Sequence, residues 1–247
     1  MNENPDASFP ETRWTMVLAV RNGGDTTIGY RALAELCRIY WPPLYGYARR
    51  LGNPPADAED LTQGFLQHAL KTDMLSTADE SVGQMRNFLR KSFNNYIRNT
   101  HRFANAKMRG GEVEFVRLEN LRPVELELEQ STLDHSSPDA LYDRLCAMAL
   151  VEASLAELEA EHERAGKAAL FTAFRPFLDP QGDDGKEPQE VLAERLGLSP
   201  GNVRIILSRM RKRFRVLLRQ LVRDTLHQAT EEEIDHELKA MREVLIR

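Results

Sequence analysis

The sequence predicts an all-α protein with two helical domains joined by a linker. Apolar residues recur at helical spacing through most of the chain, and runs with the alternation of a half-buried strand are absent. Clusters of turn-forming residues, such as Asn53-Pro54-Pro55 and Arg109-Gly110-Gly111, separate the helical segments. The 247 residues are enough for one large domain or two small ones.

Residues 1–111 are expected to form the N-terminal domain, with three main helices. The first covers residues 28–50 and should break or kink at Trp41-Pro42-Pro43, because proline lacks the amide donor of a helical residue. The second starts near Asp57, which is a suitable N-cap. The third covers residues 83–108 and ends at the glycine pair.

Residues 112–138 lose the helical periodicity and are rich in acids, which predicts an acidic linker. A C-terminal domain should follow at residues 139–226. Its helices are predicted at residues 139–164, 166–177, 188–196 and 200–226.

The tail at residues 227–247 contains one more helix with an acidic start, and three roles stay open for it. It caps the C-terminal domain, folds onto a basic surface as an autoinhibitor, or binds a regulator.

The net charge of −5 hides a very uneven distribution. Residues 83–111 carry seven basic and no acidic side chains, and residues 203–223 carry eight basic and none acidic. Residues 112–186 carry 17 acidic side chains against seven basic ones. Because a solvated helix face normally mixes both signs, two acid-free helices indicate two contact points for a polyanion. Attraction between this acidic segment and the two basic helices favours a closed arrangement of the protein.

The sharpest motif lies at residues 189–208 and fits a helix-turn-helix, with a plain αα-hairpin as the alternative. Ala193 is small enough for the two helices to touch, Gly197 suits a turn with positive φ, and Ser199-Pro200 caps the second helix. The shared core is expected from Leu192, Leu196, Leu198, Val203 and Ile206. Side chains at the start of the second helix reach base edges, and later basic ones meet phosphates. The predicted DNA-contacting residues are Ser199, Asn202, Arg204, Ser208, Arg209, Arg211, Lys212 and Arg213.

The helix at residues 83–108 mixes basic, amide and aromatic side chains. Aromatic rings stack on bases, amides read base edges and arginines hold the backbone, so this mixture suits single-stranded nucleic acid. Phe88 and Phe93 are expected to be core residues rather than contacts. The predicted contacts are Arg86, Arg90, Lys91, Asn94, Asn95, Tyr96, Arg98, Asn99, His101 and Arg102.

No signature of a catalytic or cofactor site occurs in the sequence. It contains no G-x-S-x-G, P-loop or G-x-G-x-x-G, and its six histidines lack paired metal-ligand spacing. We therefore expect no enzyme activity, no cofactor and no metal.

Neither a signal peptide nor a membrane span is visible, which predicts a cytoplasmic protein without a membrane partner. Cys37 and Cys146 are expected to be two buried, free thiols.

Three segments of the chain, taken in order, resemble the extracytoplasmic-function sigma factors. They are the acidic stretch Asp57–Gln63, the basic aromatic helix at 84–109 and the motif Ser199–Arg213. Sigma factors of this class are compact two-domain initiation factors of bacterial transcription. The opening Phe9-Pro10-Glu11-Thr12-Arg13-Trp14 is also similar to one subgroup, and the resemblance covers about residues 9–225. The long segment between the two basic helices and the Gly110-Gly111 interruption depart from the family pattern.

The resemblance implies a sigma factor that binds core RNA polymerase and promoter DNA, with an anti-sigma regulator as a further partner. The helix at 86–102 would open the −10 element, the helix-turn-helix would read the −35 element, and the acidic linker would thread near the polymerase channels. The implied polymerase-binding residues are Asp57, Glu59, Asp60, Gln63 and Phe65.

Two other functions are alternatives to this one. The first is a helix-turn-helix regulator with an N-terminal sensor or dimerisation domain, which would bind duplex DNA without polymerase. The second is an enzyme acting on nucleic acid, with Asp57, Glu59 and Asp60 around a metal. Carboxylates so close in sequence point to different faces of a helix, which argues against the enzyme.

Overall fold

The computed structural model describes residues 26–72, 74, 84–104, 122–133, 137–178, 188–226 and 229–246. The side chains of residues 26–36, 70–71, 101–104, 122 and 130–133 lie outside this description. The described residues form helices and turns, with one isolated antiparallel bridge between Gln84 and Leu226, so the all-α prediction is confirmed. None of the helices in these ranges is both long and apolar enough to cross a membrane.

Helix α2 (Thr26–Arg50) continues through Pro42 and Pro43, so of the break or kink that we expected there, the break is wrong and the kink stays a prediction. Proline fixes φ near the helical value, and only the carbonyls one turn earlier lose their donors. The residues that follow, among them Leu44, Tyr45 and Ala48, are almost completely buried. Packing of this segment into the core therefore outweighs the two lost hydrogen bonds.

Helix α3 (Pro55–Lys71) starts two residues before the expected position. Pro54 is its N-cap and Pro55 occupies the first helical position, so our assignment of Asp57 as N-cap is wrong. Proline is well suited to that first position because its amide would have no partner there. Asp57 instead places its charge in the first turn, where the helix dipole favours an acid.

Residues 122–133 form helix α5 (Arg122–Leu133) inside the expected linker, so the loss of periodicity that we inferred is wrong for this part. Val124 and Leu128 are buried against the core, one turn apart on the same face. Glu125 accepts hydrogen bonds from the hydroxyl of Tyr45 and from both Nε and Nη2 of Arg49, the latter two at 3.2 Å. Glu125 thus docks α5 onto α2, and Glu127 pairs with Arg144 of α6 at 2.7 Å.

The remaining helices start and end close to the expected positions. They are α4 (Met85–Ala104), α6 (Pro138–Arg164), α7 (Ala168–Phe174), η3 (Arg175–Phe177), α8 (Gln189–Arg195), α9 (Pro200–Asp224) and α10 (Glu231–Ile246). The hydroxyl of Ser137 caps α6 by accepting from the amide of Ala140 at 3.1 Å.

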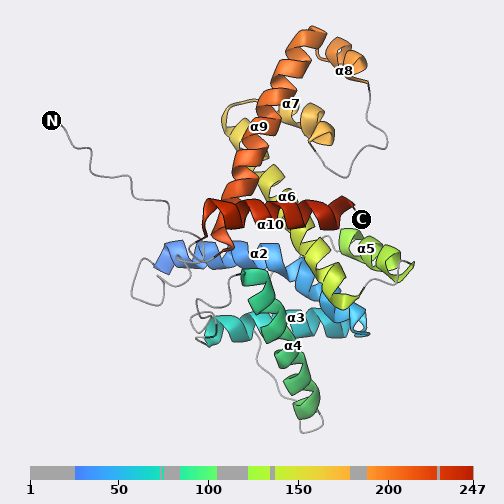
Figure 1. The fold of residues 1–247 in the computed structure, drawn as a ribbon, viewed down its shortest axis with the longest axis vertical. Coiled ribbons are helices and arrows are strands. Elements are labelled where there is room, and N and C mark those ends of the chain that lie inside the picture. The colour runs from blue at the N-terminus through green and yellow to red at the C-terminus, as the bar shows by residue number, and fades with distance from the viewer. Residues whose placement is uncertain are drawn as a thin grey trace, which may run out of the picture.

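Two hydrophobic cores share the long helices α6 and α9 (Figure 1). The lower core in this view joins α2, α3, α4, α5 and α10 to the first half of α6 and the end of α9. The upper core joins α7, η3 and α8 to the second half of α6 and the first half of α9. The two cores are therefore joined by two long helices, and the boundary between the segments that we expected as separate domains stays a prediction.

The start of α4 lies directly beside the end of α9. The amide of Met85 donates to the carbonyl of Thr225 at 3.1 Å, next to the bridge between Gln84 and Leu226. The hydroxyl of Tyr142 on α6 donates to the carbonyl of Arg86 at 3.0 Å. These contacts join the start of α4 to both α6 and the end of α9.

Both cysteines are free thiols, as expected. Cys146 is buried, whereas Cys37 is only partly buried. Burial raises the pKa of Cys37 to about 11 and that of Cys146 further above its ordinary value. Neither thiol therefore forms the reactive thiolate at neutral pH.

Candidate nucleic-acid interface

The turn between α8 and α9 is built by local contacts that the sequence specifies. Gly197 has φ of 63°, a left-handed conformation that glycine adopts without a Cβ clash. The amide of Leu198 donates to the carbonyl of Ala193 at 2.9 Å, which ends α8. The hydroxyl of Ser199 accepts from the amide of Asn202 at 3.2 Å, and Pro200 takes the first position of α9. The predicted turn and cap are confirmed.

The inner sides of α8 and α9 are anchored in the upper core. Leu192 and Val203 are completely buried, and Ala193 is only 3% exposed at the contact between the helices. The partly buried residues around them are Leu196, Leu198 and Ile206. This packing fixes which side of α9 faces outward.

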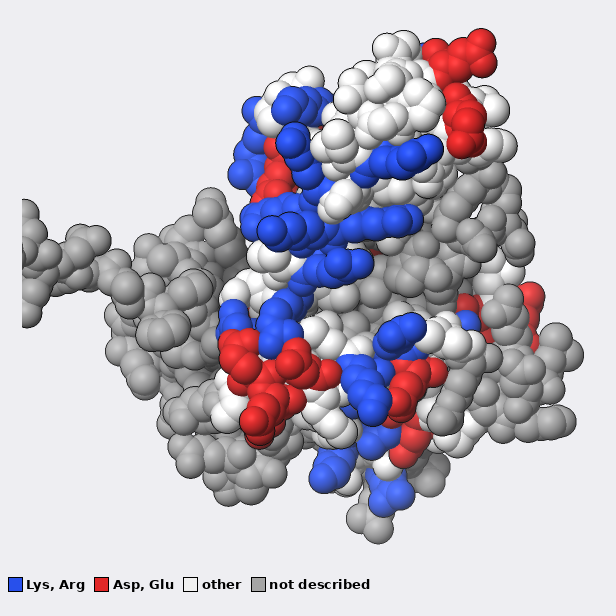
Figure 2. Space-filling view, turned by 45° about the horizontal axis from the view of Figure 1, so that its top comes forward, with Lys and Arg blue, Asp and Glu red and all other residues white. Residues whose placement is uncertain are grey.

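The outward side of α9 carries polar and basic side chains from its first turn onward. The exposed residues in its first half are Asn202, Arg204, Ile205, Ser208 and Arg209. Further exposed cations follow at Arg211, Lys212, Arg213 and Arg215. Figure 2 shows Lys and Arg side chains gathered in a band over the upper part of the molecule, where α9 lies. The surface is therefore positive over most of this helix.

Two of these cations also hold α9 in place. Arg213 donates from Nε to a carboxylate oxygen of Glu161 on α6 at 2.9 Å. This hydrogen bond holds the pKa of Glu161 below its ordinary value. Arg211 donates to the carbonyl of Phe177 at 3.2 Å. The guanidinium groups of Arg204, Arg209 and Arg215 have no ion pair among the described residues.

The aromatic residues of α4 belong to the lower core. Phe93 is completely buried, with its ring centroid 5.0 Å from that of Phe65, and Phe88 is partly buried, so their expected core role is confirmed. Tyr96 also packs against Phe65, with centroids 5.8 Å apart. We expected Tyr96 to contact nucleic acid, but its ring is partly buried between α3 and α4. It is therefore not freely available for stacking.

The polar residues of α4 divide into an exposed set and a paired set. The exposed ones are Lys91, Asn95, Arg98 and Asn99, and Asn94 is half-buried. Arg86 pairs with Glu237 at 3.2 Å and with Asp143 at 3.8 Å. Arg90 pairs with Asp139 at 3.0 Å and lies over the ring of Tyr142. The side chains of His101 and Arg102, also expected here, lie outside the described residues.

The acidic start of α3 leaves part of the expected polymerase-binding set on the surface. Asp57 and Asp60 are exposed, and Glu59 and Gln63 are half-buried. Phe65 is completely buried among core aromatics, so its assignment to a partner contact is wrong. A phenyl ring at this inward position stabilises the core instead.

Acidic residues of the tail contact both basic helices, which agrees with one of the three roles left open for it, folding onto a basic surface, although the individual pairs were not predicted. Glu231 and Asp235 of α10 pair with Arg219 and Arg223 of α9, and Glu237 pairs with Arg86 of α4. The signal was present, because an acid-rich helix follows directly after an acid-free basic one.

Among the described residues, no group of three or more His, Cys, Asp or Glu side chains is arranged to hold a metal ion. Comparison with protein-family models, curated proteins and solved structures finds no match to the chain. Any functional assignment therefore depends on the residues and their arrangement.

Proposed function

We propose that the protein is a sigma factor, which binds core RNA polymerase and reads duplex promoter DNA through α8 and α9. One observation carries this proposal: a row of exposed cations follows directly after the capped turn between the two helices. These cations are Arg204, Arg209, Arg211, Lys212 and Arg215. A row of this kind along one helix provides the sequence-independent attraction to phosphates.

The start of α9 adds side chains that suit base recognition. Asn202 and Arg204 are exposed in its first turn and a half, where a recognition helix reaches base edges. Asparagine pairs with two adenine atoms and arginine with two guanine atoms in the major groove. Ser199 and Ser208 flank them and suit contacts with the DNA backbone.

The exposed side of α4 supports a second contact, with a separated DNA strand at the −10 element. Lys91, Asn95 and Arg98 recur one turn apart on an exposed stripe, with Asn99 beside them. Cationic and amide groups of this kind hold a backbone and read unpaired bases. In this proposal the polymerase contact falls to Asp57, Glu59, Asp60 and Gln63.

A second candidate is a helix-turn-helix regulator that binds duplex DNA without polymerase. One observation favours it: α6 and α9 contribute to both cores, so two long helices rather than a linker alone join the upper and lower halves. In this arrangement Arg86 and Arg90, expected at the −10 element, are engaged in ion pairs.

Selection from a random duplex library separates the two candidates. The library is incubated with the protein alone, with bacterial core polymerase alone and with both together, and bound fragments are sequenced. A sigma factor enriches fragments with two spaced elements when both proteins are present. A regulator enriches one element without polymerase. If no sequence is enriched under any condition, both proposals are wrong.

A further inference from the structure

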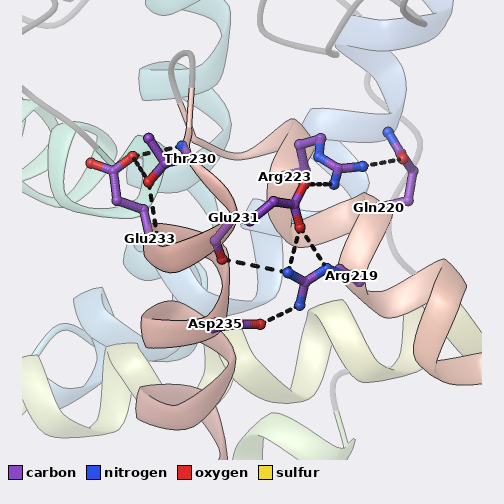
Figure 3. A network of polar contacts seen from close by, with 7 residues as sticks. All are labelled: Arg219, Gln220, Arg223, Thr230, Glu231, Glu233 and Asp235. Carbon is purple, nitrogen blue, oxygen red and sulfur yellow. Dashed lines mark hydrogen bonds and ion pairs between the residues drawn. The ribbon is translucent and has the colours of Figure 1, made fainter.

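The basic residues of α9 fall into two groups with different surroundings. Those in the first two thirds are exposed, with Arg213 paired to Glu161 of α6, whereas Arg219 and Arg223 near its end meet carboxylates of α10 (Figure 3). Arg219 donates from Nε to Glu231 at 3.2 Å and from Nη1 to Asp235. Arg223 donates from Nη2 to the second oxygen of Glu231. One carboxylate thus joins two guanidinium groups.

These ion pairs are not needed to hold α10 in place. The side chains of Glu231 and Asp235 are 64% and 68% exposed, and exposed pairs contribute little to stability. The helix is anchored separately by the buried residues Ile234, Glu237 and Met241.

The start of α10 is also fixed by its own cap. The amide of Thr230 donates to Glu233 at 2.8 Å, and the amide of Glu233 donates to the hydroxyl of Thr230 at 3.3 Å. This reciprocal pair is a capping box, which satisfies the first amides of the helix (Figure 3). The charges of Glu231 and Asp235 can therefore be removed without removing the helix.

Arg219 and Arg223 have the chemistry of a phosphate site. They lie four residues apart on one side of α9, so their guanidinium groups are neighbours. A guanidinium fork binds carboxylate and phosphate oxygens with the same geometry. A carboxylate and a DNA phosphate each carry one negative charge, so Glu231 occupies this pair as a phosphate would.

We propose that Arg219 and Arg223 form a second phosphate-binding point for duplex DNA, and that Glu231 and Asp235 occupy it in the closed protein. Arg219 lies fifteen residues after Arg204, which is about 22 Å along an α-helix. That is shorter than one turn of duplex, roughly 34 Å, so one DNA segment spans both points. In Figure 2 acidic side chains are grouped where the basic band ends. DNA that extends to this end of α9 must displace them.

The inference rests on the proposed binding of duplex DNA by α9. Its test is the affinity of the full chain for a fluorescein-labelled 30-base-pair duplex of mixed sequence, measured by anisotropy from 50 to 200 mM NaCl. The variant is Glu231→Gln with Asp235→Asn, which uncovers both arginines. The matched control is Glu232→Gln with Glu243→Gln, which removes the same charge from two exposed residues of α10 without an ion pair among the described residues. Circular dichroism checks that all three proteins have the same helix content.

Two additional phosphate contacts should steepen the dependence of log K on log salt by about 1.8, at about 0.9 per contact. The ratio of the variant's affinity to the parent's affinity should therefore increase about twelve-fold when NaCl is lowered from 200 to 50 mM. The control should follow the slope of the parent. If the uncovered variant has the same slope as the control, the second phosphate site is wrong. If none of the three proteins binds the duplex, the binding of duplex DNA by α9 in the free protein, on which this inference rests, is wrong.

Discussion

The carboxylate of Glu237 on α10 accepts a hydrogen bond of 3.2 Å from the guanidinium of Arg86 on α4. The two side chains are only 5% and 16% exposed. Gln84 donates to the same carboxylate oxygen at 2.8 Å. The tail helix is therefore anchored in the lower core by a contact with the helix that starts the first basic segment.

Two substitutions of Glu237 should distinguish the effect of its hydrogen bonds on stability from the effect of its charge. Glu237→Ala leaves Arg86 and Gln84 without their acceptor and should lower the free energy of unfolding by about 2 kcal/mol. Glu237→Gln keeps a carbonyl oxygen at the same place and should lose less than about 1 kcal/mol. Urea unfolding at pH 7 measures both. If alanine is tolerated as well as glutamine, the contact does not hold α10.

The same residue predicts a pH dependence. Burial raises the pKa of Glu237 above its ordinary value of 4.5, against the opposing effect of Arg86 and with a further rise from Asp143. The folded protein thus holds this proton more tightly than the unfolded chain. As the pH rises from the pKa of Glu237 in the unfolded chain to its higher pKa in the folded protein, the parent should therefore lose stability relative to Glu237→Gln. Urea unfolding from about pH 4 to pH 8 tests this sign, and a constant difference would contradict it.

The left-handed turn at Gly197 should tolerate no side chain without cost. A Cβ there meets no atom within 4 Å, so the penalty for Gly197→Ala is purely conformational, about 1 kcal/mol. Gly201 is the matched control, because it lies in the first turn of α9 and a Cβ meets only the Ser199 hydroxyl at 3.8 Å. Gly201→Ala should leave stability unchanged or raise it. Equal losses in thermal unfolding would contradict the assigned role of the turn.

The side chain of Phe65 should matter for folding rather than for partner binding. Phe65→Ala empties a completely buried position and should cost about 3 to 5 kcal/mol of unfolding free energy. The exposed residue Asp60 on the same helix is the control, and Asp60→Asn should stay within about 0.5 kcal/mol of the parent. Chemical unfolding that finds Phe65→Ala as stable as the parent would place this ring outside the core.

Within the proposed DNA contact, Arg204 and Lys212 should play different roles. Arg204→Ala should relax base preference at one position, at about 1 to 3 kcal/mol, whereas Lys212→Ala should lower the salt slope by about one unit for all sequences. Arg213→Ala should lower it less, since this guanidinium already pairs with Glu161. Salt titrations on two duplexes that differ at one base pair measure all three. Identical profiles for Arg204→Ala and Lys212→Ala would contradict these roles.

The sequence predicted best those features that depend on neighbouring residues. The cap at Ser199 and the turn at Gly197 are local, because a hydrogen bond between residues three positions apart or a single φ determines them. Helix α2 continues through Pro42 because of burial against distant helices, which local propensity does not contain. The same holds for α5, where Glu125 accepts hydrogen bonds from Arg49 and Tyr45 about eighty residues earlier.

The charge pattern located the candidate surface but not its internal partners. Runs without acids marked α4 and α9, since composition alone shows them. Pairing of Arg86 with Glu237 joins residues 151 positions apart, so only the fold brings them together. The inward direction of Phe65, by contrast, was available from the sequence, because this residue lies on the apolar face of its helix with Leu61, Leu66 and Ala69, all of which are buried.

Run-off transcription tests the proposed function most directly. Bacterial core RNA polymerase is incubated with a library of promoter-containing fragments, with and without the purified protein, and transcripts are sequenced from their 5′ ends. The account predicts transcripts from a specific class of start sites only when the protein is present, and their loss in a variant with Arg204→Ala and Arg209→Ala. No complex with core polymerase and no specific transcript would contradict it.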